Sequence, residues 1–140
     1  MSRLENPKIN IKLKLSALWI SLIALYIYGD YFELYIPGKV ERLIDGKAIL
    51  DSPTDLLLAS ISIVIPSLMI VLSILLKPGI NRLLNIVFGT VLTLIVVLVG
   101  AGDHSPHEWY RFYVLYAVIE AVITVSIVWS AWKWPKESSG

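Results

Sequence analysis

Four long apolar stretches dominate this chain of 140 residues and leave little sequence between them. The hydrocarbon core of a bilayer is about 30 Å thick, and a helix needs roughly 20 apolar residues to cross it. Four such helices use most of the chain, so no soluble domain is expected. We therefore predict an all-α bundle of four transmembrane helices that forms a single membrane domain over residues 1–140. The predicted helices cover about residues 15–36, 53–76, 82–101 and 106–132.

The composition excludes several classes of function. Hydrophobic residues make up 56% of the chain and charged residues 16%, which is typical of a membrane protein. The net charge of +1 gives no reason to expect a nucleic-acid partner. Because the chain has no cysteine, disulfides, thiol nucleophiles and cysteine metal sites are ruled out. No phosphate loop, dinucleotide fingerprint or metalloprotease motif is present, so neither a cofactor nor a catalytic residue is expected.

Local signals mark the helix boundaries. Ser52 and Ser105 each begin the same helix-start pattern, S-P-T-D and S-P-H-E, in which serine caps and proline occupies the first helical position. Pro66 falls inside the predicted helix 53–76 and removes one backbone hydrogen bond there, so we predict a kink. The loop 37–54 is expected to hold one short amphipathic helix that ends at Gly46 and lies on the membrane surface.

The third predicted helix carries a row of small and amide side chains. Asn81, Asn85, Gly89 and Thr93 follow one another at intervals of four residues. Such a row lets a neighbouring helix approach and form hydrogen bonds, which predicts a packing face. The short turn before this helix also predicts an antiparallel hairpin with the helix at 53–76.

The basic residues predict the orientation in the membrane. Eight lie in the N-terminal segment, the 77–82 turn and the C-terminal tail, against four on the other side, so both termini are expected in the cytoplasm of a bacterial inner-membrane protein. All five tryptophans, Trp19 among them, are then expected near an interface as aromatic anchors. The eight are Arg3, Lys8, Lys12, Lys14, Lys77, Arg82, Lys133 and Lys136, and the four are Lys39, Arg42, Lys47 and Arg111.

Glu120 lies near the middle of the predicted helix 106–132. A charged side chain at that depth costs at least roughly 2.5 kcal/mol on insertion scales, so such a residue is by default a candidate functional group. Pro66 is fourteen residues past Ser52, and Glu120 is fifteen past Ser105, which places both at the same level. Because Pro66 has no N–H, the carbonyl of Ser62 loses its helical donor at this level.

Two helical faces point to a cavity. Tyr113 and Tyr116 share a face with Glu120, and Tyr26 and Asp30 lie at comparable depth on the first helix. We expect these faces to line one aromatic cavity that opens outward and reaches Glu120, next to the interrupted helix. The candidate ligand- or proton-binding residues are Tyr26, Asp30, Ser62, Tyr113, Tyr116 and Glu120.

Three functions are compatible with this pattern. In the first, a proton- or cation-responsive transporter or ligand-binding protein exchanges a proton on Glu120 for a small cationic or amphipathic ligand. In the second, a structural accessory subunit uses the same carboxyl group, neutral and hydrogen-bonded to a tyrosine, a serine or the Ser62 carbonyl, for helix packing. In the third, a membrane enzyme acts on a lipid-like substrate, although no nucleophile or metal cluster supports it. Membrane lipids and a second copy of the chain are the other expected partners.

The segment D-H-S-P-H-E is the one candidate for a metal site. Asp103, His104, His107 and Glu108 provide oxygen and nitrogen donors. The segment is also an exposed helix start, where the same residues cap the helix and face water. We therefore assign no metal site.

Three stretches carry a resemblance to a known family. They are N-P-K-I-N-I-K-L-K-L-S-A-L-W-I at the start, P-S-L-M-I-V-L-S in the second helix and I-E-A-V-I-T-V-S-I-V-W-S-A-W-K-W-P near the end. The chain resembles an uncharacterised family of short bacterial four-helix membrane proteins, and the likeness covers almost its whole length. The resemblance implies the four-helix layout and no particular activity.

Overall fold

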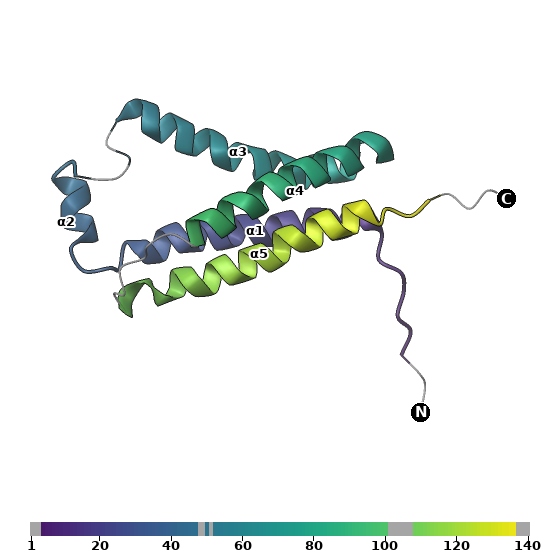
Figure 1. Ribbon diagram of the computed structural model, residues 1–140, viewed down its shortest axis with the longest axis horizontal. Coiled ribbons are helices and arrows are strands. Elements are labelled where there is room, and N and C mark those ends of the chain that lie inside the picture. Colours follow the sequence, from purple (N-terminus) through teal and green to yellow (C-terminus); the bar gives the residue numbers. More distant parts are fainter. Residues whose placement is uncertain (1–3, 48–49, 51, 101–107, 137–140) are drawn as a thin grey trace.

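The computed structural model describes residues 4–47, 50, 52–100 and 108–136. Within them the chain is helical and contains no strand, which confirms the all-α prediction (Figure 1). Four helical segments are long and apolar enough to cross a membrane, so the chain is a multi-pass membrane protein. They are α1 (Ile11–Glu33), α3 (Pro53–Leu75), α4 (Pro78–Gly100) and α5 (Arg111–Trp132), which continues the short 3₁₀ helix η1 (Glu108–Tyr110).

The helix starts follow local capping. Asn10 caps α1, with its Oδ1 accepting a hydrogen bond of 2.9 Å from the backbone N–H of Lys12, so this helix begins earlier than predicted. Ser52 caps α3 as predicted, and its Oγ accepts from the N–H of Asp55 at 3.1 Å. Helix α4 begins at Pro78, several residues before the predicted start, because proline fits the first helical position without a donor.

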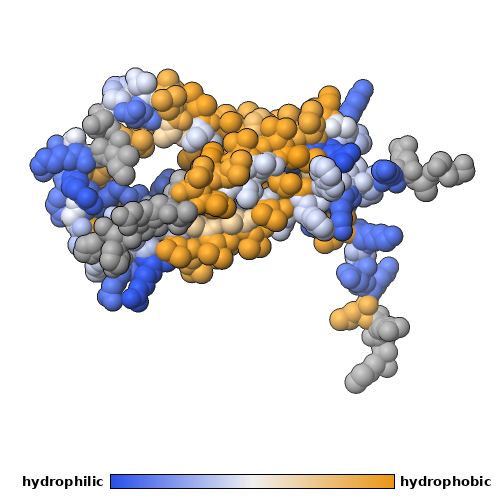
Figure 2. All heavy atoms as spheres, in the orientation of Figure 1, coloured by the Kyte–Doolittle hydropathy of each residue, from blue (hydrophilic) through white to orange (hydrophobic). Residues whose placement is uncertain are grey.

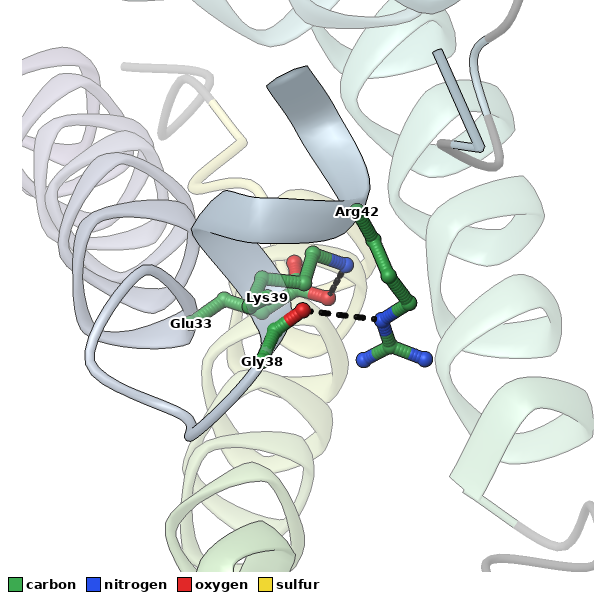
Figure 3. Close-up of polar contacts among 4 residues, drawn as sticks. All are labelled: Glu33, Gly38, Lys39 and Arg42. Carbon is green, nitrogen blue, oxygen red and sulfur yellow. Dashed lines mark hydrogen bonds and ion pairs between the residues drawn. The ribbon is translucent and has the colours of Figure 1, made fainter. Parts of the chain in front are cut away.

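The predicted short helix after the first span is present as α2 (Lys39–Ile44). It lies between Gly38 and Gly46, whose φ angles of 76° and 67° fall in the region that favours glycine. Glu33 at the end of α1 forms an ion pair with Lys39, and Arg42 Nε donates to the Gly38 carbonyl at 3.3 Å (Figure 3). The ion pair holds the start of α2 against the end of α1, and the hydrogen bond lies within α2 and its N-cap. Its position on a membrane surface stays a prediction.

The helices pack more tightly at one end of the bundle than at the other. We call the half with the α3–α4 connection, Lys77, the closed end, and the half with α2 and the first turns of α3 and α5 the open end (Figure 1). Both described ends of the chain lie at the closed end. Among the described residues, a cluster of fully buried apolar side chains lies there: Leu15, Trp19, Leu22, Met69, Ile127 and Ala131.

The predicted hairpin of α3 and α4 forms, but the two helices contact each other only sparsely. Extensive contacts join α1 to α3, α1 to α5 and α4 to α5 instead. At the open end α3 stands away from α4 (Figure 1). Pro66 lies inside α3 and is buried, and the kink there stays a prediction.

A buried polar network crosses the closed end. Trp19 Nε1 on α1 donates to Asn85 Oδ1 on α4 at 2.7 Å. Asn85 Nδ2 donates to Asn81 Oδ1 at 2.7 Å, and Asn81 Nδ2 donates to the Ser73 carbonyl of α3 at 2.6 Å. The expectation that Trp19 is an interfacial anchor is therefore wrong, because this hydrogen bond places the indole in the core. Three helices are joined by amides that would otherwise lack partners in an apolar surrounding.

Gly89 lies where α4 packs tightly against α5. A Cβ atom there would lie 2.8 Å from Val128 Cγ2 and 3.3 Å from Ile127 Cγ2, shorter than ordinary contacts. Asn81, Asn85 and Gly89 are all buried, so the predicted packing face of α4 is confirmed.

We expect Gly89→Ala to destabilise the protein by about 1–3 kcal/mol. The added methyl meets the β-branched side chain of Val128, which has one strongly preferred rotamer in a helix, so α4 and α5 are expected to separate. Gly79→Ala is the matched control on the same helix, where nothing lies within 4 Å of the added Cβ. Alanine is the better helix former, so the control should be neutral or stabilising. Unfolding free energies in mixed micelles would test this, and equal values for the two variants would contradict it.

We expect Trp19→Phe to lower the unfolding free energy by about 1 kcal/mol, the size of an interhelical hydrogen bond in membrane proteins. Phenylalanine keeps most of the apolar volume but removes the donor to Asn85. Trp129→Phe is the control, because Trp129 is exposed on α5 and its indole N–H makes no hydrogen bond with a described residue. The same loss in both variants would mean that the indole volume matters and the hydrogen bond does not.

Candidate functional site

A cavity of about 410 Å³ lies in the open half of the bundle. Helices α1, α3, α4 and α5 all contribute to its wall. The space-filling view shows an opening beside the start of α3, where this helix stands away from α4 (Figure 2). All six residues that the sequence singles out line this cavity. They are Tyr26 and Asp30 from α1, Ser62 from α3, and Tyr113, Tyr116 and Glu120 from α5.

Helix α1 and helix α5 lie side by side along the cavity, and Tyr116 packs beside a glycine of α1. Gly29 is buried, and a Cβ atom there would lie 3.5 Å from Cδ2 of Tyr116, an ordinary contact distance. The tyrosine ring therefore lies next to the turn of α1 that carries Tyr26 and Asp30. Glu120 follows Tyr116 one helical turn deeper along α5, half buried. The helical spacing thus brings the two predicted faces together.

The described lining of the cavity contains two carboxylates, Asp30 and Glu120, and no Lys or Arg side chain. The three ion pairs among the described residues lie outside it, and the nearest one joins Glu33 to Lys39 at the end of α1. Neither Asp30 nor Glu120 takes part in an ion pair with the described part of the chain. A carboxylate held in an apolar wall without a cation is costly, so a ligand with positive charge would be favoured here.

Glu120 is not held in place by a hydrogen bond to the side chain of another described residue. The side-chain hydrogen bonds that the structure shows between described residues include none to this carboxyl group. The Ser62 carbonyl, one of the predicted partners, accepts no side-chain hydrogen bond from a described residue, and the Ser62 Oγ donates to the Ala59 carbonyl at 2.6 Å within its own helix. This arrangement differs from that of Asn85, whose amide is fully bonded inside the core.

Helix α3 supplies a polar edge of the cavity. Ser62 lies on the wall, and the buried Pro66 one turn later has no N–H to donate to the Ser62 carbonyl. A backbone oxygen without its helical donor can bind a cation or a proton-carrying group. The proline itself does not line the cavity.

Sequence reasoning missed the α4 wall. Leu92, Ile95 and Val96 close the cavity on that side. Their apolar side chains carry no signal that separates a cavity wall from a lipid-facing surface. The one polar row on α4, which runs through Asn85, points to the core at the closed end.

The metal candidates fall largely outside the described residues. Asp103, His104 and His107 lie there, as does the predicted cap Ser105. Glu108 is described, and it pairs with Arg111 at 3.3 Å on an exposed surface. In the described ranges, no three His, Cys, Asp or Glu side chains lie close enough to hold a metal ion.

We expect a cysteine at position 62 to react with charged thiol reagents that cannot cross the membrane. The chain has no native cysteine. Ser62→Cys faces the cavity, whereas the matched control Ser60→Cys lies on the exposed surface of α3 away from it. Both serines bond only a carbonyl of their own helix, so the two substitutions remove equivalent contacts. In proteoliposomes Ser62→Cys should be modified, and a cationic methanethiosulfonate should react on the order of tenfold faster than an anionic one. Equal labelling at both positions would show that water does not reach the cavity selectively.

Comparison with known proteins identifies the family and no function. No curated protein and no solved structure matches the chain. A protein family described as "Family of unknown function (DUF6326)" matches residues 4–139, nearly the whole length. The chain, with its four helices long enough to cross a membrane, belongs to this family of unknown function.

Proposed function

We propose that this protein binds a small organic cation in the open-end cavity and exchanges it for a proton on Glu120, as a transporter or a ligand-binding protein of the bacterial inner membrane. The observation that carries the proposal is the pair of carboxylates, Asp30 and Glu120, in a cavity whose described lining contains no Lys or Arg and in which neither carboxylate forms an ion pair with a described residue. With both termini in the cytoplasm, the open end faces outward.

The exchange follows from the position of the carboxyl group. A charged group in an apolar surrounding is unfavourable unless an opposite charge or a proton neutralises it. Glu120 can be neutralised by a cation or by a proton, and the two exclude each other. One side chain is therefore enough to couple binding of a cation to release of a proton.

The remaining wall favours a cation with an apolar body. Tyr26, Tyr113 and Tyr116 provide ring faces that attract cations and hydroxyls that form hydrogen bonds. The aliphatic side chains of α4 complete an apolar lining. A volume of about 410 Å³ lies in the usual range for sites of small organic ligands.

The packing of the helices suggests how a ligand reaches the cavity from each side of the membrane. The core formed by Leu22, Trp19 and Met69 does not line the cavity and lies between it and the outer surface of the closed end. Transport in this scheme requires the closed end to open while the open end closes, as in alternating access. The sparse contacts of α3 with α4 make α3 the helix that can move with the least loss of packing.

We expect Glu120→Gln to weaken binding of tetraphenylphosphonium, an apolar organic cation, at least tenfold, about 1.4 kcal/mol. Glutamine keeps the shape and the hydrogen bonding but can neither carry charge nor titrate. Binding to the wild type should fall as the pH is lowered, because the proton neutralises Glu120, whereas the variant should bind weakly and lose the part of this pH dependence that Glu120 contributes. Glu108→Gln is the control, since it removes an exposed carboxylate from the start of the same helical segment.

Proteoliposomes with an imposed pH gradient separate transport from binding alone. A transporter moves the cation across the membrane as protons move the other way, and Glu120→Gln stops this exchange. A binding protein shows the pH-dependent affinity without flux. If the wild type binds no organic cation, or if Glu120→Gln binds it as well as the wild type at each pH, the proposal is wrong and the accessory-subunit interpretation replaces it.

A further inference from the structure

A second cleft, of about 290 Å³, lies where the C-terminal end of α1 meets the N-terminal end of α5. Its lining is almost entirely aromatic. The six lining residues are Phe32, Tyr35, Ile36, Trp109, Phe112 and Tyr116. Five of these six side chains are aromatic, contributed by the two ends of the chain segments that meet here.

The rings meet at steep angles. The centroids of Phe32 and Phe112 lie 6.3 Å apart with planes inclined by 68°, and those of Phe112 and Tyr116 lie 5.9 Å apart at 90°. Phe32 and Tyr35 are 6.3 Å apart at 49°. Trp109 adds a fifth ring that pairs with none of the others and is 56% exposed. The paired rings are therefore inclined to one another and are not stacked flat.

This arrangement suits a cation that cannot donate hydrogen bonds. A quaternary ammonium group is held by aromatic faces through cation–π attraction, and aromatic cages are the usual form of such sites. The charge at this end of the bundle is complementary, since six described acidic residues lie there against four basic ones. The acidic residues are Asp30, Glu33, Glu41, Asp45, Asp55 and Glu108, and the basic ones are Lys39, Arg42, Lys47 and Arg111.

The basic side chains of the chain engage other rings. Arg82 lies 5.9 Å from the ring centroid of Trp132, and Lys133 lies 4.1 Å from that of Trp129. Both contacts belong to the closed end. Among the described residues, no Lys or Arg lies over a ring of the aromatic cleft. The cation–π capacity of the cleft is thus left for a ligand.

We propose that the aromatic cleft of α1 and α5 is a binding site for a quaternary ammonium group, carried by a free organic cation or by the headgroup of a choline lipid. The site contains neither Asp30 nor Glu120, so it does not depend on the proposed proton exchange. Tyr116 lines both the cleft and the cavity, so one ring separates the two sites. A cation bound in the cleft is one side chain away from the acidic cavity.

The test compares choline with its neutral isostere 3,3-dimethylbutan-1-ol, using the full chain in phosphatidylglycerol nanodiscs. The wild type should bind choline, and the isostere should bind at least tenfold more weakly. Trp109→Leu should lower the choline affinity roughly fivefold or more, because it removes an exposed ring face from the cage. Trp129→Leu is the matched control, since Trp129 is 58% exposed and lies at the other end of the same helix. Circular dichroism and thermal unfolding verify that both variants fold.

A second lipid distinguishes the two sources of the ammonium group. In phosphatidylcholine nanodiscs a headgroup site is filled by lipid, so added choline should no longer bind, and native mass spectrometry should show phosphatidylcholine retained by the wild type and lost from Trp109→Leu. A site for free cations should bind choline equally in both lipids. Choline binding that persists in Glu120→Gln separates this site from the proposed exchange site. If choline and the isostere bind alike, or if Trp109→Leu binds choline as the wild type does, the cluster is an interfacial anchor and the proposal is wrong.

Discussion

The hydrogen bond from Trp19 to Asn85 is the contact on which the arrangement of this bundle depends. Lipid is as apolar as the helix surfaces, so burial of hydrocarbon gives transmembrane helices little reason to associate, whereas unpaired amides and close-packed small residues do. The Asn85 network joins α1, α3 and α4, and Gly89 brings α5 against α4 next to it. All four long helices are therefore fastened in the same half of the molecule.

The open end is loosely packed because these contacts are concentrated in the closed half of the bundle. Above the network, α3 has few buried side chains and contacts α4 sparsely, so a cavity remains between the four helices. The polar groups found there are of a different kind. Asn85 is satisfied by its neighbours, whereas Asp30 and Glu120 have no ionic partner among the described residues. The molecule thus separates the polar groups that hold it together from those available to a ligand.

The cavity and the aromatic cleft offer two kinds of attraction for positive charge. In the cavity the attraction comes from carboxylates, which also bind protons and thereby make binding depend on pH. In the cleft it comes from ring faces, which do not titrate. Tyr116 belongs to both walls and rests on Gly29 of α1, so the two sites meet at one side chain whose position is set by the approach of two helices.

The sequence alone determined the features that depend on one helix at a time. Hydropathy and length predicted the four long helices, the cap at Ser52 predicted the start of α3, and helical spacing placed Tyr113 and Tyr116 on the face of Glu120. It also placed Tyr26 and Asp30 at the right depth, because depth follows from the rise per residue.

Only the tertiary structure decided which faces meet. The position of Trp19 in the sequence predicts an interfacial anchor, but its hydrogen bond to the Asn85 amide on another helix places it in the core. The wall formed by Leu92 and Val96 and the separation of α3 from α4 likewise depend on which helix lies opposite. Apolar side chains look the same in sequence whether they face lipid, a cavity or another helix, and only the partner across the gap distinguishes these surroundings.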